Sequence, residues 1–385
     1  MKTTLRVLFI KLLAITLFIF IGSTAQAQLS ASIPFNSSHS DTSAKLISAV
    51  PFNYSEKEEE KSRAFDFLSA EISESTDRQL QKNISLKLSK RQERKLLMDY
   101  FKQLEVNDRL SGNQANKKVY YRFANLFARL KLYPLAMKFF LKTLEQEKPK
   151  TDPGTGSANL KNVDINADLP INDKDDSLVT QQAELVRNEK SKRTSYNQIL
   201  TFFNNSKTAV AYAMLFHVKQ PVAGKRKVFV FSNTGHTFIT LIKYYADSTY
   251  VSCSFGFYPK KDHPLSATPV YPSSSSQFKN DAGHQWDEVV GKFISKKKFD
   301  RIINLTKNYE NLEYHLSKNN CTDFCLQAAT MAGINIANTK GKWPLGSGNN
   351  PGVTGQSLLN GTFSNADAAN TASDLFSTLN LSVLP

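Results

Sequence analysis

The spacing of hydrophobic and polar residues divides the chain into segments of different character. From residue 56 to 148, apolar residues recur at helical intervals among charged ones, and Gly112 is the only glycine. This pattern predicts a helical N-terminal domain over residues 56–148. Residues 149–194 are polar, proline-punctuated and aperiodic, which predicts a linker between this domain and the next.

Aromatic and small residues within the helical region follow a recognisable spacing. Large, small and aromatic side chains recur on one helix and again on the next, at Tyr120, Phe123, Ala124, Phe127, Ala136 and Phe140. This spacing resembles a tetratricopeptide unit, in which small residues let two antiparallel helices approach closely. A single copy cannot form a solenoid. We therefore expect one tetratricopeptide-like hairpin, with either a packing role or a role in binding a protein partner.

A second domain is expected over residues 195–338. Aromatic and β-branched runs predict strands at 227–233, 235–245 and 249–259, and the short turn between the last two predicts an antiparallel pair. Helical stripes follow, first after Ser295 and then over "CTDFCLQAATMAG", which ends at Gly333.

The expected fold class is therefore α+β, a helical N-terminal domain followed by an antiparallel sheet packed against the cysteine-bearing helix. Residues 339–385 contain four glycines by Gly352 and then a run rich in Ser, Asn and Ala. They are expected to form a loop-rich tail.

The N-terminus has the features of an export signal. Lys2, Arg6 and Lys11 accompany an apolar run, and Ala25-Gln26-Ala27 matches a cleavage site, so residues 1–27 are interpreted as a signal peptide. Residues 28–55 are rich in Ser, Thr, Asn and Pro and are expected to form a disordered tether. No later stretch is long enough to span a membrane. The mature chain is expected to be periplasmic or secreted.

The charge of the protein does not indicate a nucleic-acid partner. Removing the three basic residues of the signal lowers the formal charge from +15 to +12. The remaining lysines are spread along the chain without interleaved aromatic residues, which is typical of solvated surface. We expect no nucleic-acid partner and no cofactor.

Three cysteines leave at least one thiol unpaired in an oxidising compartment. Cys321 begins a predicted helix directly after Asn319 and Asn320, either of which suits an N-cap. Unpaired N–H groups and the helix dipole stabilise a thiolate there, so Cys321 is a candidate nucleophile. Asp323 is expected to be a favourable charge in the first helical turn.

Other interpretations of the cysteines stay open at this stage. Cys321 is alternatively a buried structural thiol, and a bridge between Cys253 and Cys325 would leave it as the only thiol. The three cysteines with His236 have the atom types for zinc but lack the close spacing of structural sites, so no metal is expected. Among six histidines, His236 alone opens a strand inside an apolar segment, where an unused imidazole is costly.

The segments "GHTFITL", "GFYP" and "YHLSKNNCTDFCLQAATMAGI" together resemble the circularly permuted NlpC-like branch of papain-fold cysteine hydrolases, in which the histidine strand precedes the cysteine helix. The resemblance covers about residues 225–335. It implies Cys321 as nucleophile and His236 as base, with the Cys321 N–H donating to the oxyanion. A third polar residue orients the histidine in such enzymes. Counting across the hairpin favours Ser254, with Tyr258 and Asp262 as alternatives.

The resemblance implies a papain-like cysteine peptidase or amidase that cleaves an amide bond in a peptide or a cell-wall stem peptide. Two alternatives remain. One is an acyl-ester or lipid hydrolase or acyltransferase, because the same branch resembles lecithin:retinol-type acyltransferases. The other is a non-catalytic binding or assembly module that recruits a partner through its helical domain.

Overall fold

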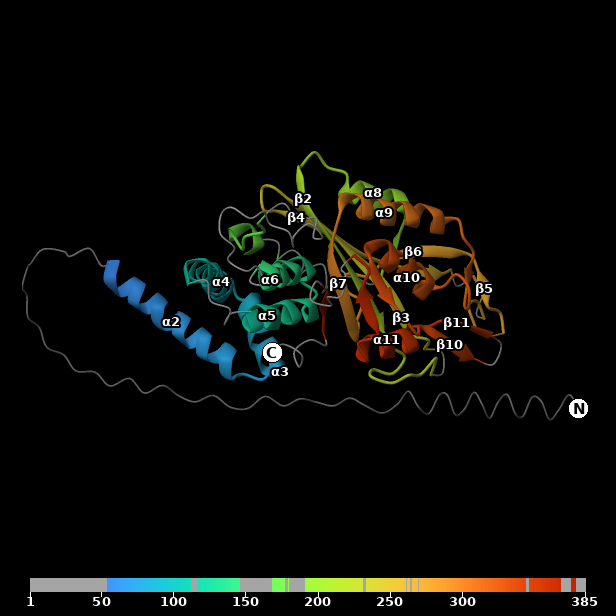
Figure 1. Cartoon of the computed structure of the whole chain (residues 1–385), viewed down its shortest axis with the longest axis horizontal. Coiled ribbons are helices and arrows are strands. Elements are labelled where there is room, and N and C mark those ends of the chain that lie inside the picture. Colours follow the sequence, from blue (N-terminus) through green and yellow to red (C-terminus); the bar gives the residue numbers. More distant parts are fainter. Residues whose placement is uncertain are drawn as a thin grey trace, which may run out of the picture. The chain divides into compact units, whose positions relative to one another are not determined.

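The computed structural model describes residues 54–111, 117–145, 168–176, 179, 191–230, 233–260, 262–263, 265–268, 270–343, 346–367 and 375–378. The expected signal peptide lies outside the described residues, as does nearly all of the expected tether. From Glu56 onward the described residues belong to one compact unit. Helices cover both faces of its antiparallel sheet (Figure 1).

The N-terminal region is helical, as predicted. Its helices are α2 (Tyr54–Glu74), α3 (Asp77–Ser89), α4 (Arg91–Ser111), α5 (Lys117–Arg129) and α6 (Tyr133–Glu145). Thr76 begins α3 with a capping box that includes Gln79. Helices α5 and α6 form a hairpin, and the residues at the tetratricopeptide-like positions are all buried in it. Lys131 adopts a left-handed conformation (φ 62°) in the turn that joins them.

The sheet contains seven antiparallel strands in the order β1-β6-β4-β3-β2-β7-β13. These strands are β1 (Arg193–Thr194), β2 (Ala209–Lys219), β3 (His236–Tyr245), β4 (Tyr250–Pro259), β6 (Ser276–Asn280), β7 (Glu288–Ile294) and β13 (Phe376–Ser377). The predicted hairpin of β3 and β4 is confirmed, with Thr240 opposite Ser254.

The prediction of a strand at 227–233 is wrong. In the described part of that segment, Val230 and Asn233 make only an isolated bridge, and Phe229 is exposed. The strand next to β3 is β2, which the sequence reading missed. Its run "AVAYAMLFHV" is apolar without alternation because both of its faces are covered, so the period-2 signal of a half-exposed strand is absent.

Side chains of β3 alternate between two hydrophobic layers. Phe238, Ile242 and Tyr244 pack in one cluster with helices α2 to α6, whereas Ile239 and Leu241 join a second cluster on the other face. The helical region therefore shares a continuous core with the sheet and does not form a separate domain. Part of the expected linker belongs to this core, since Leu169 and Ile171 are buried in it.

The second layer contains α8 (Tyr196–Phe203), α9 (Lys296–Glu310), α10 (Cys321–Ala332) and α11 (Pro351–Leu359). In Figure 1, α10 and α11 lie on the opposite side of β7 from α5 and α6. Two short strands, β5 (Ser273–Ser274) and β8 (Tyr314–His315), pair beside this layer. No helix in the described part of the chain has the length and hydrophobicity needed to cross a membrane.

The C-terminal region is more ordered than the expected loop-rich tail. It contributes a hairpin of β10 (Lys340–Trp343) and β11 (Gly346–Asn349), helix α11, and β12 (Phe363–Asn365), which pairs with β9 (Ile334–Ile336). Phe376 of β13 packs against Tyr121 and Phe140, with ring centroids 6.1 and 5.6 Å apart. Tyr121 also donates a hydrogen bond of 2.5 Å to the carbonyl of Ser377. These contacts tie β13 to the α5–α6 hairpin.

Candidate active site

Cys321 is the first residue of α10, and its neighbours fix the start of that helix. The side-chain oxygen of Asn320 accepts hydrogen bonds from the N–H groups of Thr322 (2.7 Å) and Asp323 (3.0 Å). The Asp323 carboxylate accepts in turn from the Asn320 N–H at 3.0 Å, which completes a capping box. Gly333 ends the helix at φ 89°, as predicted. The sulfur is thus held at a helix N-terminus.

The structure brings Cys321 and His236 together from segments 85 residues apart in sequence. The Cys321 thiol and the His236 ring interact, and this interaction lowers the pKa of the thiol and raises that of the imidazole. Both residues are largely buried, with 6% of Cys321 and 7% of His236 exposed. All three cysteines are thiols, so the considered bridge between Cys253 and Cys325 is not formed and the sulfur of Cys321 is available.

The second nitrogen of His236 is bound to Asp281, a residue that the sequence reading did not identify. His236 Nε2 donates to Asp281 Oδ2 at 3.1 Å, and the Asp281 side chain is fully buried. The Tyr258 hydroxyl donates to the other carboxylate oxygen at 2.5 Å, and its ring lies 4.2 Å from the His236 ring. Because Nε2 faces the carboxylate, Nδ1 is the nitrogen left for the sulfur.

Ser254 does not contact the His236 ring. Its hydroxyl is hydrogen-bonded to Thr240 at 2.7 Å, four residues further along β3 than His236. The serine contributes through its backbone instead, because its carbonyl accepts the Asp281 N–H at 2.8 Å. The alternative Asp262 is also elsewhere, with its carboxylate bound to the Ser275 hydroxyl. Of the three residues considered, only Tyr258 is part of the site.

Gly256 leaves room for the contact between His236 and Asp281. A Cβ atom at this position would lie 2.5 Å from Asp281 Oδ2 and 2.6 Å from His236 Nε2. Both distances are shorter than van der Waals contact allows. The glycine in "GFYP" is therefore required where the β4 backbone passes the imidazole and the carboxylate.

The electrostatics of the pair favour a thiolate and an imidazolium. Burial disfavours the charged imidazole, but the Asp281 carboxylate and the Cys321 sulfur outweigh burial and raise the pKa of His236 to about 9. Burial also opposes ionisation of the thiol, yet His236 and hydrogen bonds from Thr237 lower the pKa of Cys321 below its usual value. The proton shared by the two groups is thus held on the imidazole.

Tyr314 of β8 is a further polar group close to the sulfur, as is Thr322, whose hydroxyl lies 3.9 Å from it. The buried Tyr314 hydroxyl interacts with both the sulfur and the backbone amide of Cys321. Burial, followed by the nearby sulfur, raises the pKa of Tyr314 well above its usual value, so the phenol stays protonated. The Cys321 N–H is the expected donor to the oxyanion. The Tyr314 hydroxyl lies beside this N–H and is able to donate to the oxyanion in its place.

The loop that follows β6 is anchored to the helical layer. It contains Asp281 and also His284, whose ring lies 5.0 Å from the His236 ring. Lys131, from the turn between α5 and α6, donates through Nζ to the carbonyl of Gly283 at 2.5 Å. Only 7% of Lys131 is exposed, and this contact is partly buried. The helical region thereby helps to hold the carboxylate beside the imidazole.

The C-terminal region supports the cysteine from the other side. Asn320 Nδ2 donates to the carbonyl of Asn349 at 2.9 Å, and Asn349 Nδ2 donates to Asp323 Oδ1 at 2.7 Å. Thr339 in turn donates to the Asn349 side-chain oxygen at 2.6 Å. The β10–β11 hairpin and its flanks therefore brace the first turn of α10.

These contacts define a candidate active site of Cys321, His236 and Asp281, with Tyr258, Thr237 and Tyr314 around it. Comparison of the chain with protein-family models, with curated proteins and with solved structures gave no match.

Proposed function

We propose that the protein is a thiol-dependent hydrolase with a permuted papain-like catalytic fold, and that it cleaves an amide bond. The observation that carries the proposal is the chain of contacts from the Cys321 sulfur through the His236 ring to the buried Asp281 carboxylate. A nucleophile bound to a base, and the base bound to an orienting group, is the arrangement that covalent acyl transfer requires. The histidine strand preceding the cysteine helix adds support.

The reaction begins with the thiolate of Cys321 attacking the carbonyl carbon of the scissile amide. A C–S bond forms and the carbonyl π electrons move to oxygen, giving a tetrahedral oxyanion. The imidazolium of His236 then gives its proton to the leaving nitrogen as the C–N bond breaks, which releases the amine and leaves a thioester. Water attacks the thioester with His236 as base, the C–S bond breaks to regenerate the Cys321 thiolate, and the acid is released.

Asp281 and Tyr258 act through His236 in this mechanism. The carboxylate accepts the Nε2 proton, which fixes the ring orientation and stabilises its positive charge during attack. Tyr258 donates a hydrogen bond to the second oxygen of the Asp281 carboxylate, so that this buried oxygen also has a partner. Because both oxygens of Asp281 accept a hydrogen bond, rotation of the carboxylate away from His236 would break these bonds.

The oxyanion is stabilised by donors beside the sulfur. The Cys321 N–H lies at the start of α10, where the helix dipole also favours negative charge. The Tyr314 hydroxyl, kept protonated by burial and in contact with the same amide, is able to donate to the oxyanion in place of the Cys321 N–H. Both groups are fixed before substrate arrives, which is what makes such donors effective.

The favoured substrate is a peptide or a cell-wall stem peptide. The export signal expected at residues 1–27 would bring the mature chain to a compartment that contains cell wall, and the proposal includes that periplasmic or secreted location. Because Cys321 is buried, only a narrow segment of a substrate is able to reach its sulfur. An extended peptide meets this requirement more easily than a folded protein does.

Substrate profiling tests the proposal. Mature protein and a Cys321→Ala variant are incubated with purified cell wall, with a peptide library and with acylated lipids, and new amines, acids and Cys321 adducts are measured by mass spectrometry. The proposal expects amide cleavage by the unmodified protein only, with an acyl group trapped on Cys321. Cleavage of the lipid ester alone would identify an acyl hydrolase, and equal product with both proteins would favour a binding module.

A further inference from the structure

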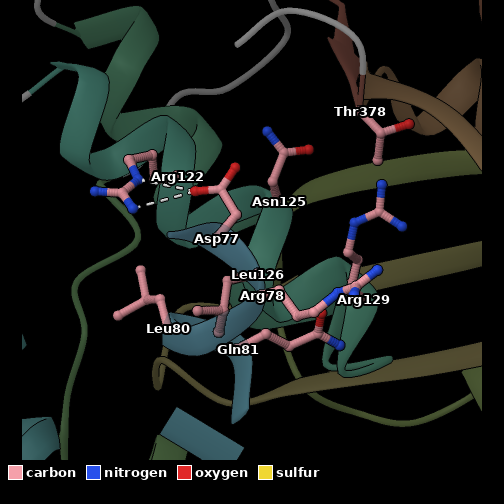
Figure 2. Close-up of a pocket in the computed structure, with 9 residues that line it drawn as sticks. All are labelled: Asp77, Arg78, Leu80, Gln81, Arg122, Asn125, Leu126, Arg129 and Thr378. Atoms are coloured by element: carbon pink, nitrogen blue, oxygen red, sulfur yellow. Dashed lines mark hydrogen bonds and ion pairs between the residues drawn. The ribbon is translucent and has the colours of Figure 1, made fainter. Parts of the chain in front are cut away.

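A second site of chemical interest lies in the helical layer, where a pocket of about 330 Å³ opens between α3, α5 and the end of β13. None of its lining residues belongs to the candidate active site. Three arginines line it, Arg78, Arg122 and Arg129, against one carboxylate, Asp77. Figure 2 shows Arg122 joined to Asp77, with Arg78 and Arg129 together in another part of the pocket.

Arg122 is committed to holding the protein together. Its guanidinium pairs with Asp77 at 3.1 Å and donates to the carbonyl of Ser75 at 2.8 Å, just beyond the end of α2. It also donates to the carbonyl of Ile72. This arginine therefore satisfies a helix C-terminus and balances the only carboxylate of the pocket.

Arg78 and Arg129 differ from Arg122 in that neither forms an ion pair within the part of the chain that the structure describes. The guanidinium of Arg129 lies 5.4 Å from the centre of the Trp286 ring and also interacts with the carboxylate of Glu288, whose pKa burial raises to about 7. Arg78 lies in the first turn of α3, where the helix dipole adds to its positive charge. Three guanidinium groups thus face two carboxylates, Asp77 and Glu288, which leaves a net positive charge at the pocket beside a helix N-terminus.

Asn125 supplies an independent sign of a ligand. Its side chain is 5% exposed, and its Oδ1 atom has no hydrogen-bond partner among the described residues. Its Nδ2 atom makes only a long contact of 3.3 Å to the carbonyl of Tyr121. A buried carbonyl oxygen without a donor is destabilising, so a ligand that brings an N–H or O–H group to this position would be favoured.

We infer that this pocket binds a small anion whose oxyanion group, a phosphate or a carboxylate, pairs with Arg78 and Arg129 while a neighbouring hydroxyl or N–H of the same molecule donates to Asn125. Guanidinium groups suit both oxyanions because their paired N–H groups match two oxygens. The pocket volume is near the lower limit of small-molecule sites, which restricts the ligand to about the size of a sugar phosphate or a hydroxy acid.

Calorimetric titration tests this assignment in the Cys321→Ala background, so that the result does not depend on hydrolase activity. The probes are glycerol 3-phosphate, glycerate and inorganic phosphate at constant ionic strength, with glycerol as the uncharged control. Arg78→Gln and Arg129→Gln are compared with Arg301→Gln, an exposed arginine of α9 outside the pocket. Circular dichroism verifies that each variant is folded.

Saturable binding of glycerol 3-phosphate or glycerate, weakened about ten-fold or more by each pocket variant and unchanged by Arg301→Gln, is the expected result. The tighter of these two probes identifies the preferred oxyanion. Glycerol 3-phosphate is also expected to bind more tightly than inorganic phosphate, with the difference lost in Asn125→Leu. Absence of saturable binding, or equal affinity in all the arginine variants, would overturn the assignment.

Discussion

His236 Nε2 lies 3.1 Å from Asp281 Oδ2. Asp281, which directly follows β6, thereby adds a third residue to the pair of His236 on β3 and Cys321 on α10. The carboxylate is fully buried and has a second donor in Tyr258. A buried carboxylate with this geometry holds an imidazole in one orientation and stabilises its protonated form. The predictions below follow from this contact and from the groups that support it.

Replacement of Asp281 by Asn is expected to reduce kcat/KM by roughly 10² to 10⁴ while the protein stays folded. The amide keeps the shape of the carboxylate but removes the charge that holds the proton on His236. Hydrolysis of the preferred substrate is the measurement. Ser254→Ala is the matched control, because it costs about 1 kcal/mol of stability through its lost hydrogen bond to Thr240 and leaves the rate nearly unchanged. The reverse ranking of the two variants would assign the orienting role to the serine.

Gly256→Ala tests the space between the imidazole and the carboxylate. The added methyl group would lie 2.5 Å from Asp281 Oδ2, so the two side chains must separate. We expect alkylation of Cys321 by iodoacetamide to slow by at least roughly ten-fold. Gly291→Ala serves for comparison, since its methyl group meets Leu215 in the core at 2.9 Å, away from the site. It should lower the melting temperature and keep the reactivity of the folded molecule. Normal alkylation in Gly256→Ala would show that the contact is dispensable.

Lys131→Met removes the hydrogen bond to the Gly283 carbonyl while keeping most of the buried stem. The loop that contains Asp281 then loses an anchor, and we expect the hydrolysis rate to fall roughly ten-fold. Lys118→Met, at an exposed position of α5, should have no effect. Equal rates in the two variants would mean that the helical layer contributes to stability but not to positioning.

The pH dependence of hydrolysis should have two limbs. The rate rises with pH as Cys321 ionises, and this limb lies below the ordinary range of a thiol because His236 and Thr237 lower the pKa of Cys321. The rate falls again as pH passes about 9, because His236 then loses the proton that the leaving nitrogen needs. Asp281→Asn should move the upper limb to lower pH. An upper limb at the same pH in Asp281→Asn would show that Asp281 does not raise the pKa of His236.

The two ends of the candidate site could be predicted from the sequence because each has a local signal. Cys321 follows a residue suited to cap a helix, and His236 opens an apolar strand. The residues next to each of them in sequence were therefore enough to identify both as candidates. Asp281 has no such signal. It reaches His236 only because β6 pairs with β4 and the chain then bends back, which is a relationship between three strands.

The register of the β3–β4 hairpin places Tyr258, and not the expected Ser254, beside His236. Thr240 pairs with Ser254, so the serine lies four residues along β3 from His236, or about 13 Å away. The same register continued to the start of β3 brings Tyr258 next to the histidine, as the ring contact of 4.2 Å confirms. The predicted turn over residues 246–248 is the observed one, since Tyr244 pairs with Tyr250, so the wrong choice of Ser254 came from the count along the strands and not from the turn.

The layers of the fold were predicted only in part. Amphipathic helices and the β3–β4 hairpin follow from periodicity, but β2 lacks an alternating pattern because helices cover both of its faces. The contact between the α5–α6 hairpin and the sheet was missed for a related reason. Buried aromatic residues such as Phe139 and Phe140 look alike whether they face a neighbouring helix or a sheet.

The most direct test of the account is the rate of Cys321 alkylation by iodoacetamide as a function of pH, followed at the peptide level by mass spectrometry. It is measured in Cys253→Ser protein with and without His236→Ala. Paired with His236, the sulfur should react as a thiolate well below the usual pKa of a thiol, and this reactivity should move to higher pH without the histidine. Identical profiles in the two proteins, both at the ordinary thiol pKa, would contradict the proposed pair.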